Sequence, residues 1–158
     1  MLQEFYYMLY LRVFFILLLG STANLSMANS TEQLEKKLTE LQGQVVYLDF
    51  WASWCGPCRK SFPWMNEMQT KYKAQGFTIV SVNVDSEKEL ADKFLSNNPA
   101  NFTVIYDPKG KIARQFKLKG MPSSYLINKE GKIVSAHVGF VEKKKPIYEQ
   151  AIKQLIQQ

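Results

Sequence analysis

The chain contains two cysteines, Cys55 and Cys58, which are separated by Gly56 and Pro57. A bridge between residues so close in sequence closes a very short loop and constrains little chain entropy. The spacing therefore argues against a structural staple, and a chemical role for the two cysteines is favoured. Disulfide exchange needs an attacking thiolate and a second thiol that can resolve the mixed disulfide. The spacing supplies both if a helix begins at the first cysteine.

Such a helix would place the two sulfur atoms in different environments. At a helix N-terminus, unpaired backbone amides and the helix dipole would favour the thiolate of Cys55 and lower its pKa. Cys58 would lie one turn later on the same face and deeper in the protein. Pro57 presets a helical φ, and Gly56 leaves room where the chain of a partner must approach.

Asp49 stands six residues before Cys55, within an apolar stretch that we expect to be a strand. If the carboxyl group is buried there, desolvation raises its pKa, and it could exchange a proton with Cys58. The alternative is an aspartate at a strand end or edge that is exposed to water. The residue pattern alone leaves both interpretations open.

A metal site is the rival interpretation of the cysteine pair. Zinc bound by four ligands needs further cysteines or histidines, and the chain has a single histidine, His137. His137 falls in the last expected strand, where it is either a surface or satisfied core residue or a copper ligand together with Cys55 and Cys58. We expect no bound metal, and copper binding is the alternative.

The N-terminus has the layout of a targeting segment. Arg12 precedes an unbroken apolar run at 13–19, and residues 26–28 (Ser-Met-Ala) offer small residues for a cleavage site. We therefore expect 1–28 to be a secretory signal peptide or, if uncleaved, an N-terminal membrane anchor. A membrane span needs about 20 apolar residues. Residues 29–158 are then expected to form one domain.

Helices and strands are expected to alternate along the rest of the chain. Expected strands are 45–50, 77–84, 103–106, 124–127 and 132–138; expected helices are 30–42, 55–75, 86–97, 111–116 and one starting near Pro146. The last two strands flank Asn-Lys-Glu-Gly at 128–131 and predict a hairpin. This order predicts an α/β fold with a mixed sheet covered on both faces.

Three details of the helices are also predicted. Ser30 should start the first helix, with Gln33 as its capping-box partner. Asp85 or Ser86 should cap the third helix. One face of the last helix should be apolar, and it is expected to comprise Ile147, Ala151, Ile152 and Leu155.

The segment 49–60 (Asp-Phe-Trp-Ala-Ser-Trp-Cys-Gly-Pro-Cys-Arg-Lys) resembles the active-site segment of the thioredoxin superfamily. The segments 120–127 and 131–134 resemble the superfamily's cis-proline strand and hairpin. The export signal and the stretch 85–119 resemble the TlpA/ResA/DsbE-like branch, which carries an insertion there. The resemblance implies a thioredoxin fold over 29–158, with a mixed central sheet, helices on both faces and a TlpA-like insertion.

The resemblance also implies roles by position. Cys55 would be the nucleophile, Cys58 the resolving cysteine and Asp49 the buried acid. Met121–Pro122 would be a cis peptide beside the disulfide. Expected substrate-binding residues are Trp54, Gly56, Pro57, Met121 and Pro122, whereas Trp51 is expected to serve packing.

The implied activity is reduction of protein disulfides in the periplasm, with a membrane thiol electron donor recharging the oxidised form. Cytochrome c maturation is one pathway in which such proteins act. No cofactor is expected beyond the redox-active cysteine pair, and the protein is expected to be a monomer that is tethered to the inner membrane if its signal is uncleaved. No interleaving of basic and aromatic residues suggests nucleic-acid binding.

Overall fold

The structure is a computed structural model, and it describes residues 29–158. Along the chain lie α2 (Ser30–Glu40), β1 (Val45–Trp51), α3 (Gly56–Tyr72), η1 (Lys73–Gln75), β2 (Phe77–Asn83), α4 (Lys88–Asn97), β3 (Thr103–Tyr106), α5 (Lys111–Gln115), β4 (Ser123–Ile127), β5 (Ile133–Val138), η2 (Glu142–Lys144) and α6 (Lys145–Ile156). The order of helices and strands is the one predicted from the sequence. The signal or anchor expected at 1–28 lies outside the described residues.

The five strands form one mixed sheet in the order β3-β2-β1-β4-β5. The pairs β1–β2 and β2–β3 are parallel, because α3 and α4 return the chain to the same end of the sheet. The pairs β1–β4 and β4–β5 are antiparallel. The mixed sheet that the alternating pattern predicted is thereby confirmed.

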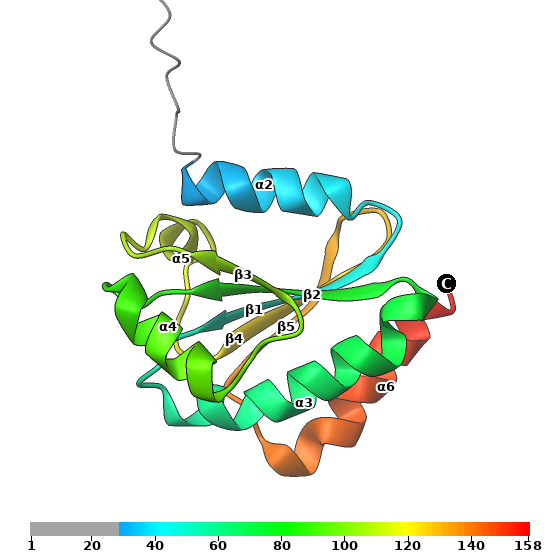
Figure 1. Cartoon of the computed structure of the whole chain (residues 1–158). Helices are drawn as coiled ribbons and strands as arrows, with labels where there is room; N and C mark the ends of the chain where they lie inside the picture. Colours follow the sequence, from blue (N-terminus) through cyan, green and yellow to red (C-terminus); the bar gives the residue numbers. More distant parts are fainter. Residues whose placement is uncertain (1–28) are drawn as a thin grey trace, which may run out of the picture.

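Helices cover both faces of this sheet (Figure 1). One face carries α2 and α5, and its core includes Leu48 and Phe50 of β1 together with Ile112 of α5. The other face carries α3, α4 and α6, and its core includes Tyr47 and Trp51 of β1. Side chains alternate across a strand, so the odd-numbered residues of β1 all point towards α3.

Strand β1 is buried along its whole length, since it lies at the centre of the sheet and both faces are covered. A fully buried strand is expected to be continuously apolar. Asp49 breaks that rule, and its side chain belongs to the α3 face. The carboxyl end of β1 leads directly into the loop before Cys55, so the sheet positions both groups.

Two predicted caps are wrong. The first helix does begin at Ser30, but Asn29 is its N-cap and accepts a hydrogen bond from the Thr31 amide at 3.3 Å. Ser30 instead donates its hydroxyl to Asp107, 77 residues away in sequence. Helix α4 starts at Lys88 with Glu87 as N-cap, so neither Asp85 nor Ser86 caps it.

The apolar face of the last helix is only partly as predicted. Ile152 is fully buried, and Ala151 and Leu155 are packed against the core. Ile147, in the first turn of α6, is 64% exposed and does not belong to the buried face. Within residues 29–158, no helix combines the length and the apolar character needed to cross a membrane.

Candidate active site

Cys55 lies at the junction between the loop after β1 and helix α3. It is the N-cap of α3 in an extended conformation, with φ −80° and ψ 108°. Its Sγ accepts a hydrogen bond from the backbone amide of Cys58 at 3.3 Å. The sulfur thus takes the place of the side-chain oxygen in an ordinary N-cap. A thiolate at this position is stabilised by that amide and by the helix dipole.

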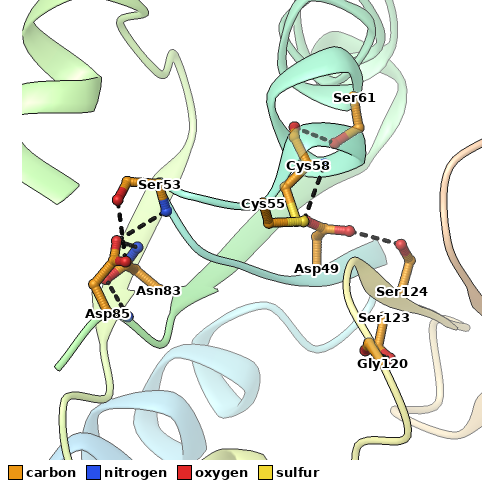
Figure 2. Close-up of a disulfide and its surroundings, with 10 residues drawn as sticks. All are labelled: Asp49, Ser53, Cys55, Cys58, Ser61, Asn83, Asp85, Gly120, Ser123 and Ser124. Atoms are coloured by element: carbon orange, nitrogen blue, oxygen red, sulfur yellow. Dashed lines mark hydrogen bonds between the residues drawn. A yellow bond between two sulfur atoms is a disulfide. The ribbon is translucent and has the colours of Figure 1, made fainter. Parts of the chain in front are cut away.

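Cys55 and Cys58 form a disulfide with an Sγ–Sγ distance of 1.98 Å (Figure 2). Cys55 is 5% exposed and Cys58 is completely buried, so the two sulfurs differ in access as predicted. Trp54, immediately before the pair, is 68% exposed. Trp51 is fully buried and donates its indole N–H to Ser81 at 3.2 Å, which confirms its packing role.

Gly56 and Pro57 occupy the first turn of α3. A Cβ added at Gly56 would meet no atom of the chain within 4 Å, so nothing inside the protein requires a glycine there. The open space faces outward beside Cys55, where an incoming chain must approach. Pro57 sits where a helix has no acceptor for a backbone N–H, so the missing donor costs nothing.

Asp49 is 1% exposed, so the interpretation as a water-exposed aspartate is wrong. Its Oδ1 accepts a hydrogen bond from the Ser124 hydroxyl at 2.6 Å, while Oδ2 is buried and has no hydrogen-bond partner among residues 29–158. Burial raises the pKa of Asp49 to about 7, and the bond from Ser124 opposes this shift. Figure 2 shows the carboxyl group beneath the disulfide, with one oxygen directed to Ser124.

Two side chains beside Asp49, those of Ser124 and Tyr47, were not anticipated as site residues, and His137 was considered only as a copper ligand or as a surface or satisfied core residue. Strand pairing aligns Asp49 with Ser124 and Ser124 with His137, so all three lie in one row on the α3 face. Tyr47, two residues before Asp49, contacts His137 through a hydrogen bond of 3.3 Å between Oη and Nε2. Only the register of three strands reveals this row, and no local motif signals it.

His137 is half-buried and stacks on Tyr148 of α6, with ring centroids 4.5 Å apart and planes 7° apart. Burial lowers its pKa, and the nearby Lys144 lowers it further. These contacts fit the interpretation of His137 as a core histidine whose ring is packed and hydrogen-bonded within the protein. No group of three or more histidine, cysteine, aspartate or glutamate side chains suited to a metal occurs within the described residues.

A second buried carboxyl group supports the loop before Cys55. Asp85 is 2% exposed and accepts hydrogen bonds from the backbone amide and the hydroxyl of Ser53, at 3.0 and 3.1 Å. The Asn83 side-chain amide donates to it at 2.8 Å. Figure 2 shows this cluster at the other end of the loop from Asp49. It ties the end of β2 to the active-site loop, a role that sequence analysis missed.

The Met121–Pro122 peptide bond is cis, as the resemblance implied. The segment leads into β4, whose Ser124 reaches Asp49. Pro122 accepts a hydrogen bond from the Gly139 amide at 2.7 Å through its carbonyl, which anchors the segment to the end of β5. The strand and the disulfide therefore border the same Asp49 side chain.

A mixed sheet with helices on both faces, and a Cys-Gly-Pro-Cys disulfide at a helix N-terminus, define a redox protein of the thioredoxin fold. The chain belongs to the Redoxin family, whose sequence pattern matches residues 21–152.

Curated relatives support the TlpA/ResA/DsbE-like branch. The thiol-disulfide oxidoreductase ResA of Bacillus subtilis is 35% identical over 120 residues, which is 76% of this chain and 67% of that protein. ResA of Geobacillus thermodenitrificans is 33% identical over 124 residues, or 78% and 71% of the two chains.

Solved structures also match this chain. The crystal structure of a candidate thiol:disulfide interchange protein DsbE from Chlorobium tepidum matches with a TM-score of 0.74 and 55% identity, over 75% of this chain and 84% of that chain. StoA from Bacillus subtilis matches with a TM-score of 0.58 and 30% identity, over 66% and 82%. With its Cys55–Cys58 pair, the protein is a thiol–disulfide oxidoreductase that works by dithiol–disulfide exchange.

Proposed function

We propose that the protein reduces disulfides of exported proteins, with Cys55 as nucleophile, Cys58 as resolving cysteine and Asp49 as proton acceptor. The observation that carries the proposal is a disulfide whose first sulfur caps a helix N-terminus and whose second belongs to a fully buried cysteine, with a buried carboxyl group beneath the pair. The Gly56–Pro57 dipeptide, which resembles that of reducing members, supports the direction.

The reaction begins when the Cys55 thiolate attacks one sulfur of a substrate disulfide. The first substrate thiolate leaves and takes a proton from water, and Cys55 is joined to the second in a mixed disulfide. Cys58 then gives its thiol proton to the Asp49 carboxylate and attacks Cys55 Sγ. The second substrate thiolate leaves and is protonated, the substrate has gained two electrons, and the Cys55–Cys58 disulfide has formed.

Five residues are proposed to bind the substrate chain around the disulfide. Trp54 offers an exposed aromatic surface, and Gly56 offers open space beside Cys55. Pro57, Met121 and Pro122 border the same approach, and a proline without an amide hydrogen leaves room for the substrate backbone to pair alongside.

We place this reaction in the periplasm, with the protein either released by cleavage or tethered to the inner membrane by 1–28. The apolar run at 13–19 and the small residues at 26–28 support export. The oxidised protein would be recharged by a membrane thiol electron donor, it would act as a monomer, and cytochrome c maturation is one pathway it would serve. Nothing in the site favours the copper alternative, because His137 is engaged by Tyr47 and Tyr148.

A redox titration of the Cys55–Cys58 couple against dithiothreitol tests the direction. A potential near about −270 mV supports a reductase, and one near about −120 mV contradicts it and indicates an oxidase. Reduction of insulin disulfides by the purified protein measures its reductase activity. Cys58→Ser should leave a persistent mixed disulfide on Cys55 that identifies natural substrates, and Cys55→Ser is its control because it cannot form one.

A further inference from the structure

The reaction described above does not explain how a proton travels between the buried Asp49 carboxyl group and water. In each cycle the carboxyl group gains or loses a proton, yet it is 1% exposed and lies under the disulfide. Around it on the α3 face are apolar core side chains such as Trp51, Phe62 and Met65. A buried carboxyl group can turn over only as fast as protons travel between it and water, so a path for the proton is needed.

Two serines flank Asp49 on the neighbouring strands within residues 29–158. Ser81 pairs with Asp49 across β1–β2, but its hydroxyl accepts from the Trp51 indole and donates to the Thr103 carbonyl, which cannot pass a proton on. The serine on β4 has a different set of neighbours.

Ser124 donates to Asp49 Oδ1 at 2.6 Å. Tyr47 lies on the same face of β1 as Asp49 and diagonally across the β1–β4 pair from Ser124, a position within reach of an aromatic side chain. Tyr47 in turn meets His137 Nε2 at 3.3 Å. His137 is half-buried in β5, an edge strand whose other side chains are exposed.

Asp49 and the three side chains that follow it can each give and accept a proton. The serine and tyrosine hydroxyls each carry one hydrogen and can accept another, and neutral imidazole accepts at one nitrogen and donates at the other. The row is enclosed by aromatic rings, since Trp64 packs edge-on against Tyr47 and Tyr148 stacks on His137. Such enclosure holds the polar groups in line and keeps them apart from bulk water.

We propose that Ser124, Tyr47 and His137 form a proton relay that connects Asp49 to solvent. After Cys58 has given up its proton, Asp49 passes one to Ser124, which passes its own to Tyr47, which passes its own to His137 Nε2. His137 then releases the proton on Nδ1 to water. Reduction of the disulfide runs the same transfers in reverse, so that Asp49 can protonate the departing Cys58 thiolate.

The titratable and charged groups that face the relay are few. Cys55 and Cys58 approach Asp49 from α3, Tyr148 faces His137 from α6, and Lys144 of η2 acts on His137. Burial raises the pKa of Tyr47 well above its ordinary value, and the neighbouring Asp49 carboxylate adds to this effect. Tyr47 therefore stays protonated at neutral pH and acts as a carrier rather than as an acid.

The test measures reduction of the Cys55–Cys58 disulfide by dithiothreitol, followed by stopped-flow tryptophan fluorescence from about pH 6 to about pH 9. Tyr47→Phe removes the hydroxyl and keeps the ring, and it should slow the reaction about tenfold, a part of the roughly hundredfold that general acid–base catalysis supplies. His137→Ala should slow it similarly, and added imidazole should restore the rate. Tyr125→Phe is the matched control, because that hydroxyl lies on the opposite face of the sheet and bonds to Phe116.

A role limited to packing would not respond to imidazole, so slow variants without rescue would overturn the relay. Unchanged rates in Tyr47→Phe and His137→Ala would overturn it as well. In an Asp49→Asn background, Tyr47→Phe should have no further effect, because the acid that the relay serves is gone. The relay rests on the proposed function, but the assay uses a small reductant. Failure of the wild-type protein to reduce insulin would therefore defeat the proposed function alone.

Discussion

A buried aspartate lies at each end of the active-site loop, and the two carboxyl groups differ in the number of hydrogen bonds that they accept. Asp85 is 2% exposed and accepts three hydrogen bonds, two from Ser53 and one from Asn83. Asp49 is 1% exposed, accepts one bond from Ser124, and has an oxygen without a partner. Both side chains come from the carboxyl ends of neighbouring parallel strands or the residues just after them.

Burial by itself does not make a carboxyl group reactive. Hydrogen-bond donors replace the water that an ionised carboxylate loses on burial, and each donor favours the charged form. Asp85 has enough donors to serve as a fixed anchor for the loop. Asp49 has one, and burial raises its pKa to about 7, where it can exchange protons with a thiol.

The largest difference between the two sites should appear in stability against pH. The pKa of Asp49 rises from 3.8 to about 7 on folding, so between these values the folded oxidised protein holds a proton that the unfolded chain releases. The free energy of unfolding therefore falls as pH rises from about 4 to about 7, by about 4 kcal/mol in all. Asp49→Asn should remove this loss and be more stable than the wild type above about pH 7.

Urea unfolding of the oxidised proteins at about pH 4 and about pH 8 measures this effect. Equal losses of stability in the wild type and in Asp49→Asn would show that Asp49 is not the group responsible.

Asp85→Ala should lower the free energy of unfolding, whereas Asp49→Asn raises it above about pH 7, and the change should be somewhat smaller. It leaves the Ser53 amide and the Asn83 side-chain amide without their acceptor, at a cost of about 3 kcal/mol at neutral pH. Thermal and urea unfolding measure the loss. Asp92→Ala is the control, because that aspartate is exposed and paired with Lys88, and exposed pairs contribute less than about 1 kcal/mol. A neutral outcome for Asp85→Ala would mean that the anchor is not needed.

Ser124→Ala removes the one side-chain hydrogen bond that Asp49 accepts within the part of the chain that the structure describes. Because that bond favours the ionised form, its loss should raise the pKa of Asp49 above about 7. Above that pH the variant should be less stable by about 2 kcal/mol, the usual contribution of a hydrogen bond to a charged group. Infrared titration of the protonated carboxyl band reports the pKa directly. A downward shift would contradict the role assigned to Ser124.

Ser53→Ala should give the smallest effect, because Asp85 keeps its bonds from the Ser53 backbone amide and from Asn83. We expect a loss of about 1 kcal/mol in the free energy of unfolding at neutral pH. Urea unfolding of Ser53→Ala and Ser124→Ala at about pH 8 compares the two losses directly. A loss in Ser53→Ala as large as that in Asp85→Ala would show that the Ser53 hydroxyl, and not the backbone and Asn83 donors, holds the loop.

Local chemistry along the chain was enough to predict the elements and the redox pair. The order of helices and strands follows from apolar periodicity and turn residues, and Cys55 as the first residue of an N-terminal helical turn follows from the Cys-Gly-Pro-Cys spacing. These features depend on residues within a few positions of one another. The helix caps were less predictable. Asn29, and not Ser30, is the N-cap of α2, and Asp85 accepts hydrogen bonds from Ser53 instead of capping α4.

The tertiary structure alone decided which side chains meet. Asp49, Ser124 and His137 are separated by more than 70 and then 13 positions, and only the strand order β1-β4-β5 and its register place them in one row. The residue pattern alone left the burial of Asp49 open, and only the resemblance to the superfamily implied a buried acid. A carboxyl group's pKa depends on what covers it and on the donors within reach. Those are properties of the packed sheet and helices, and no short stretch of sequence contains them.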